Sequence, residues 1–154
     1  MKVGIQKVHE NEWLVQIGCA IMRLDRFSVE LLDITLEHML ALAHGEQHST
    51  FNSYLKLGMK LKQLSPSDIQ VVTREVDNHD MVVLLGYAKD QELTDKVFNN
   101  VGGILAKQME KDLLNNPLPE GREARDCVRR VVEKLFLLDS QGKIEFIDEN
   151  TQYI

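Results

Sequence analysis

The sequence predicts an α+β fold that is mostly α: a β-hairpin or small sheet with two helices, followed by a bundle of short helices. Three observations predict it. Apolar and polar residues alternate over residues 3–17, as in half-buried strands. From about residue 31 onward, apolar residues recur at helical spacing. Cap residues, glycines and prolines then divide the helical part into short segments.

The N-terminal segment is expected to form strands. Residues 3–8 and 13–17 are rich in β-formers and are separated by a polar turn at 9–12, and residues 19–24 are expected to add a third short strand. An isolated hairpin is marginally stable in water. It should therefore pack on helices or on a partner.

Two helices are expected next. Asp25 or Ser28 is a suitable N-cap for the first helix, which Gly45 ends, and residues 44–49 are expected to form a polar loop. A second helix is expected over residues 51–64. Pro66 after Ser65 then suits the first turn of a new helix. We place a domain boundary there, giving domains 1–63 and 64–154.

The remaining chain is expected to be helical almost throughout. Asp77 to Asp80 cap a helix that runs through Leu85, and further helices are expected over 90–101, 104–114 and 122–138. A tight turn at Gly102-Gly103 separates two of them. The helix over 122–138 has the strongest apolar stripe. Residues 143–147 alternate like a short terminal strand, and residues 148–154 are expected to be a loose tail.

The amino-acid composition and net charge limit the classes of function that the chain can have. With 44% hydrophobic and 27% charged residues, the chain suits a folded domain with a polar surface. A net charge of −6 disfavours nucleic acid as a partner. No signal peptide and no apolar run of about 20 residues is present, so no direct membrane insertion is expected. Two lone cysteines fit a reducing, cytoplasmic setting.

No motif indicates catalysis. His44 and His48 have metal-ligand spacing on a helix, but Gly45 interrupts that helix and no third ligand follows. Cys127 lacks a nucleophile signature. We therefore expect no enzyme and no cofactor. A metal-dependent or thiol enzyme that uses His44, His48 or Cys127 is the weaker alternative.

Residues 64–147 resemble the C-terminal domain of the flagellar motor switch protein FliG. The resemblance lies in the order of several short segments. They are Leu64 to Met81 with its Ile69-Gln70 and Arg74-Glu75-Val76-Asp77 motifs, Glu92 to Val101, Ala106, Lys111-Asp112-Leu113 and Gly142-Lys143-Ile144. The resemblance implies a compact bundle of short helices. It also implies a charged helix that contacts the cytoplasmic part of the motor's stator. Residues 1–63 do not resemble the middle domain of that family.

The sequence departs from the family at the contact charges. Leu85 stands where the family has a lysine before a glycine, and Ile104 replaces an arginine of the contact helix. The acidic pair becomes Lys111-Asp112, and Pro119 takes the place of another arginine. Of these charges only Asp112 is retained. Because charge complementarity selects partners, we do not expect a conventional stator contact.

The expected contact residues lie on two segments. Lys107, Glu110, Lys111 and Asp112 give the contact helix a different charge pattern that suits another partner. The alternative is an ordinary solvated face. Trp13 is a contact candidate because aromatic residues favour interfaces. Its alternative role is to anchor the hairpin to the helices.

These observations favour a non-enzymatic interaction module. We expect a short stand-alone adaptor in a flagellar motor or a related membrane-associated assembly, with proteins of that complex as partners. The alternative is a working rotor component that transmits torque through charge contacts with the stator. The expected location is the cytoplasm, with peripheral attachment to the inner membrane through partners left open. A homo-oligomer is also left open.

Overall fold

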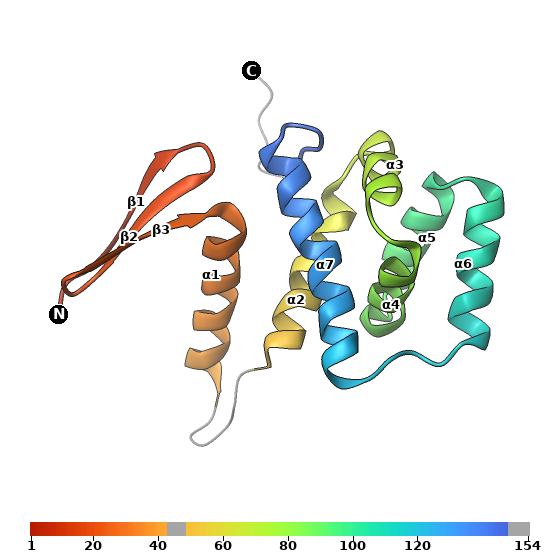
Figure 1. Cartoon of the computed structure of the whole chain (residues 1–154), viewed down its shortest axis with the longest axis horizontal. Helices are drawn as coiled ribbons and strands as arrows, with labels where there is room; N and C mark the ends of the chain where they lie inside the picture. The colour runs from red at the N-terminus through yellow and green to blue at the C-terminus, as the bar shows by residue number, and fades with distance from the viewer. Residues whose placement is uncertain (43–48, 148–154) are drawn as a thin grey trace. The chain divides into compact units, whose positions relative to one another are not determined.

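The computed structural model describes residues 1–42 and 49–147. A three-stranded antiparallel sheet comes first and helices follow it (Figure 1). This confirms the α+β, mostly α, class. The chain forms two compact units, Met1–Ser53 and Tyr54–Ile154. The functional division after residue 63 stays a prediction.

The sheet of the first unit has the order β1-β2-β3, with β1 (Val3–His9), β2 (Glu12–Ile17) and β3 (Ala20–Asp25). The third strand, expected from residues 19–24, is confirmed. Pairing puts apolar residues opposite each other on one face of the sheet, because side chains alternate between faces. These pairs are Val3 with Ile17, Ile5 with Val15, and Val15 with Met22.

Helix α1 (Arg26–Ala41) packs against β2 and β3. Asp25 is its N-cap, since the Asp25 carboxylate accepts a hydrogen bond from the Ser28 amide at 2.8 Å. Val15 of β2 and Ile34 of α1 are buried, whereas every residue of β1 is exposed. The expected end of α1 at Gly45, and the polar loop from His44 to His48, lie outside the described residues.

The second unit begins within α2 (Thr50–Gly58), which a 3₁₀ segment, η1 (Met59–Gln63), extends. The sequence predicted one continuous α-helix over 51–64. In the structure the last part of this segment, Met59–Gln63, forms the tighter 3₁₀ helix instead. Such 3₁₀ segments are common at the ends of α-helices. A side chain at Gly58 would lie 2.7 Å from Leu84 Cδ1, so the glycine allows close approach to the neighbouring helix.

Five α-helices complete the bundle: α3 (Pro66–Glu75), α4 (Asn78–Ala88), α5 (Gln91–Asn100), α6 (Gly103–Asn115) and α7 (Gly121–Ser140). Side chains cap three of them, and the caps at Ser65 and Asp77 were expected from the sequence. Ser65 accepts from the Asp68 amide at 3.2 Å, Asp77 from His79 at 2.8 Å, and Asp90 from Leu93 at 2.8 Å.

The core of this unit lies between α4 and α7. Met81 to Leu85 of α4 are buried throughout. The predicted stripe of α7 is buried as well, and it comprises Ala124, Val128, Val131, Val132, Leu135 and Phe136. Among the described residues, no helix is long and apolar enough to cross a membrane.

The terminal strand predicted at residues 143–147 is wrong. Ile144 and Phe146 are buried and their neighbours are more exposed, so the alternation is real. The described part of the second unit, however, contains no strand with which this segment could pair. The Glu145 amide donates to the Asp68 carboxylate at 3.1 Å, and the Ile147 amide donates to the Gln63 carbonyl at 2.9 Å. The segment is therefore held in extended form by the ends of helices.

Candidate functional site

The outward face of α6 combines two lysines with two large apolar side chains. Lys107 and Lys111 are one helical turn apart and both are exposed. Ile104, three residues before Lys107, is 89% exposed, and Leu114, three residues after Lys111, is 79% exposed. Neither lysine has an ion pair with another described residue. We call Ile104, Lys107, Lys111 and Leu114 the α6 surface.

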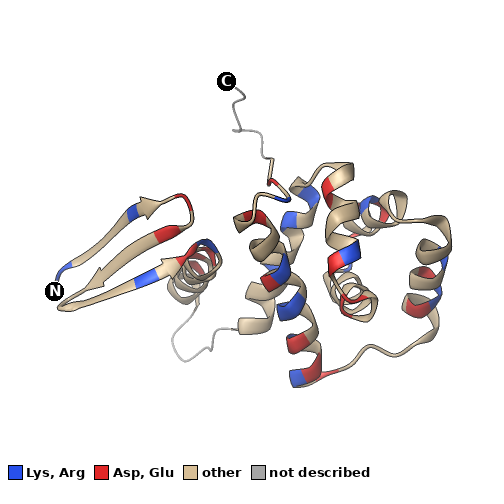
Figure 2. Ribbon diagram, turned by 45° about the horizontal axis from the view of Figure 1, so that its top comes forward, with Lys and Arg blue, Asp and Glu red and all other residues tan. Residues whose placement is uncertain are grey.

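The two acidic residues predicted beside these lysines lie on the flanks of the same helix. Helical spacing puts Glu110 and Asp112 on opposite sides of the lysine row. Glu110 is exposed, whereas Asp112 is half-buried and accepts a hydrogen bond from Asn116 Nδ2 at 3.3 Å. Asp112 also lines a small cavity together with His79 of α4. The structure therefore does not gather the four predicted residues into one cluster. In Figure 2, α6 carries both basic and acidic segments.

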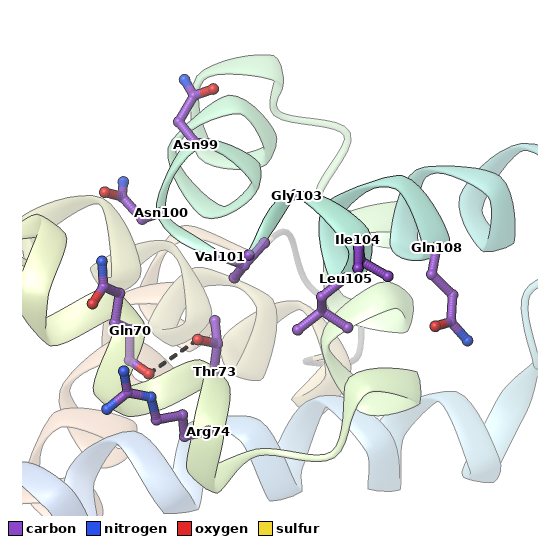
Figure 3. A pocket seen from close by; sticks show the side chains of 11 residues that line it. Gln70, Thr73, Arg74, Asn99, Asn100, Val101, Gly103, Ile104, Leu105 and Gln108 are labelled. Atoms are coloured by element: carbon purple, nitrogen blue, oxygen red, sulfur yellow. Dashed lines mark hydrogen bonds between the residues drawn. The ribbon is translucent and has the colours of Figure 1, made fainter.

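A groove adjoins the α6 surface where α3 faces the turn between α5 and α6. Its volume is about 720 Å³. Amide side chains line much of it, and Arg74 is its charged residue (Figure 3). Ile104 and Gln108 of α6 line it too, so Ile104 belongs to both the groove and the α6 surface. The amide side chains are Gln70, Asn99, Asn100 and Gln108.

The turn that closes this groove was expected from the sequence. Helix α5 ends at Asn100 and α6 begins at Gly103. A side chain at Gly102 or Gly103 would meet no heavy atom within 4 Å. This pair serves as a connection between two helices, without the further glycines, lysine and hydroxyl of a phosphate loop.

Trp13, the other predicted contact residue, lies in the first unit. It is half-buried on β2, opposite Lys7 of β1 and Leu24 of β3. The Lys7 ammonium lies 5.4 Å from the centre of the Trp13 ring, a cation–π contact. Trp13 therefore has a role within the sheet itself. Its role as a contact residue stays a prediction.

The environment of Cys127 opposes nucleophilic chemistry. Cys127 is buried beneath the pair formed by Asp80 and Arg130, and its Sγ lies 3.4 Å from Arg130 Nη2. Burial, aided by the Asp80 hydrogen bond and charge, raises the pKa of the thiol to about 11. A reactive cysteine instead needs a lowered pKa. Cys127 consequently suits the core rather than a catalytic centre.

The metal hypothesis rested on His44 and His48, which lie outside the described residues. Among residues 1–42 and 49–147, no three potential ligands from histidine, cysteine, aspartate and glutamate gather as a metal site would require.

Helix α4 contacts the loop after α6 close to two departures from the family pattern, Leu85 and Pro119. Gly86 stands next to Leu85, and a side chain at Gly86 would lie 2.7 Å from Leu118 Cδ1. The Tyr87 hydroxyl donates to the Pro119 carbonyl. Helix α4 thus holds the loop between α6 and α7 by contact and hydrogen bonding at these positions.

Sequence reasoning missed the apolar part of the α6 surface. Leu105, Met109 and Leu113 follow each other at four-residue spacing and face inward, with Met109 fully buried. Ile104 and Leu114 fall outside that row. Their position outside the inward-facing row of an amphipathic helix is the sequence signal that could have identified them as exposed apolar residues.

Comparison with known proteins supports the family resemblance. Residues 59–146, more than half of the chain, match the FliG C-terminal domain family. No curated protein matches the chain. Domains of this family are structural components of the flagellar motor and interact with other motor proteins. The match includes η1 and all five helices of the bundle that follow it. The chain therefore belongs to the FliG C-terminal domain family.

Proposed function

We propose that the chain is a non-enzymatic adaptor in a flagellar motor or a related membrane-associated assembly, and that it binds a protein partner through the α6 surface. The observation that carries this proposal is the pairing of two exposed lysines with two highly exposed apolar residues, Ile104 and Leu114. Burying large apolar side chains drives association, whereas charges select the partner. The partner surface that fits is apolar with acidic residues.

The charge arrangement distinguishes this surface from the contact helix of the family. A basic residue, Lys111, precedes Asp112, and Asp112 is partly turned toward α4 and the following loop. A partner that matched an acidic pair would meet a like charge at Lys111, which is costly. We therefore favour an adaptor with a divergent partner. Attachment at the cytoplasmic side of the inner membrane, through that partner, is part of the proposal.

The test is a double charge reversal, Lys107→Glu with Lys111→Glu. The matched control reverses two exposed basic residues of the same unit, Arg125→Glu with Lys143→Glu, so that the net charge changes equally. We expect the first variant to lose a partner that co-purifies with the unmodified chain, and the control to keep it. Equal retention of the partner by both variants would contradict the proposal.

A second experiment separates the adaptor from a torque-transmitting rotor component, which family membership also favours. Charge reversal at Lys111 and Asp112 is introduced in the native cell and swimming is measured. Unchanged swimming together with partner loss supports the adaptor. Loss of swimming with normal assembly of the motor supports the rotor component.

A further inference from the structure

Strand β1 is an edge strand, and the hydrogen bonds among the described residues leave some of its backbone groups without a partner. The Gly18 amide donates to the Lys2 carbonyl at 2.6 Å, so this opposed pair is hydrogen-bonded. Hydrogen-bonded pairs alternate along an antiparallel ladder. Gly4 and Gln6 consequently pair with β2, whereas the N–H and C=O groups of Val3, Ile5 and Lys7 point away from the sheet.

Strand β1 has few of the features that usually prevent an edge strand from pairing with another chain. Val3 is 69% exposed and Ile5 is 61% exposed, and no proline interrupts the strand. The register shift lies only at its end, between Lys7 and His9. A lysine can guard an edge, but the Lys7 ammonium is turned onto the Trp13 ring.

In the described part of the second unit the regular elements are all helices, and the extended segment 143–147 is hydrogen-bonded to Asp68 and Gln63 of that unit, so no strand of this unit is available to pair with β1. We propose that β1 pairs with β1 of a second copy of this chain, antiparallel and centred on Ile5. In this register Ile5 lies opposite the partner's Ile5, and Val3 lies opposite the partner's Lys7. No like charges are directly opposed.

The symmetry of this pairing limits the assembly to a dimer. A two-fold axis perpendicular to the sheet joins the two copies into one six-stranded sheet, with the same face of each copy on the same side. The contact uses the same strand of each copy and therefore closes on itself. Val3 and Ile5 of both copies become neighbours on the apolar face, between the two α1 helices. Pairing thus satisfies the outward N–H and C=O groups and joins two exposed apolar strips.

Cysteine cross-linking tests the register. In a Cys19→Ser background, Ile5→Cys puts two thiols opposite each other, with Cα atoms about 5.5 Å apart, within disulfide reach. The matched control is Val3→Cys. Its two thiols would be separated by four residues along the strands, about 13 Å. We expect mild oxidation to link the Ile5→Cys variant into a dimer and to leave the Val3→Cys variant unlinked. Equal linking of both variants, or linking of neither, would overturn the proposal.

A proline substitution tests the hydrogen bonds. Ile5→Pro removes an outward N–H that β2 does not use, and the preceding residue is the permissive Gly4. Ile5→Ala keeps this N–H and serves as the control. Because the substitution removes two intermolecular hydrogen bonds across the two-fold axis, we expect the dissociation constant to rise about tenfold more for proline than for alanine. Sedimentation measures it, and circular dichroism checks folding.

A chain that sediments as a monomer at every accessible concentration would overturn the proposal, as would equal dimerisation of the two variants. If Ile5→Pro unfolds the sheet, the cross-linking comparison decides by itself, since neither cysteine variant removes a backbone donor.

Discussion

Asp80 of α4 forms a two-pronged ion pair with Arg130 of α7. Arg130 Nη2 donates to Asp80 Oδ1 at 2.7 Å, and Arg130 Nε donates to Asp80 Oδ2 at 2.8 Å. The Asp80 side chain is 6% exposed, whereas the Arg130 side chain is 54% exposed. The carboxylate is thus buried between the two central helices, and the arginine covers it from the solvent side. This geometry is the strong form of a charged hydrogen bond.

Replacing Arg130 should destabilise the bundle. Arg130→Met keeps a long apolar stem but leaves the buried Asp80 carboxylate without its charged donor. Because a buried acceptor that loses a charged partner is costly, we expect a loss of about 2 kcal/mol in the free energy of unfolding. Chemical denaturation followed by circular dichroism measures it.

Arg129→Met is the matched control. Arg129 lies on the same helix and is 45% exposed, with surface contacts to Asp126 and Glu133. Such surface pairs contribute little, so the loss should stay below about 1 kcal/mol. Equal destabilisation by the two substitutions would show that the Asp80–Arg130 ion pair contributes no more to stability than the surface ion pairs of Arg129.

The ion pair between Asp80 and Arg130 should make the free energy of unfolding depend on pH. Burial alone raises the pKa of Asp80, but the hydrogen bonds from Arg130 and Cys127 and the charge of Arg130 outweigh it, and the pKa lies below its ordinary value of 3.8. A lowered pKa means that the folded state binds the proton less readily than the unfolded state does. The contribution is therefore present above pH 3.8 and is lost as pH falls through the lowered folded value.

The measurement is the free energy of unfolding of Asp80→Asn and of the unmodified chain across this range. Their difference should be largest near neutral pH and should shrink in acid below pH 3.8. A difference that stays constant with pH would mean that the Asp80 charge has no part in stability.

Gly58→Ala should destabilise the contact between α2 and α4. The added methyl group would lie 2.7 Å from Cδ1 of Leu84, and Leu84 is fully buried, so it has little space to move. Overpacking of this kind costs about 1–3 kcal/mol. Thermal unfolding monitors it. Gly103→Ala on α6 is the comparison, because open space surrounds that position, and it should leave stability unchanged or raise it slightly.

The two cysteines should react differently with a thiol reagent. Cys19 is exposed, whereas Cys127 is buried and its pKa is raised to about 11 by burial. Titration of the native chain at pH near 8 should therefore detect Cys19 alone, because the thiolate is the reactive form. In denaturant both thiols should react. Rapid modification of Cys127 in the native chain would show that α4 and α7 separate readily.

Local chemistry in the sequence determined where three helices of the bundle begin. Ser65, Asp77 and Asp90 are residues whose side chains accept hydrogen bonds from nearby amides, so their effect needs no distant partner. The stripe of α7 was readable for a similar reason, since helical spacing alone brings its members to one face. The family resemblance of residues 64–147 was readable from the order of short motifs, and the family match confirms it.

Tertiary structure alone decided the features that depend on residues far apart in the chain. Residues 143–147 alternate like a strand, but only packing shows that their partners are Asp68 and Gln63 at helix ends. Asp80 and Arg130 are fifty positions apart in the sequence, so no local pattern reveals that they pair. Lys107 and Lys111 are exposed whereas Asp112 is half-buried, and this difference depends on which side of α6 the bundle covers. Alternation, capping and helical spacing are local properties, whereas burial and partner choice follow from how the helices pack.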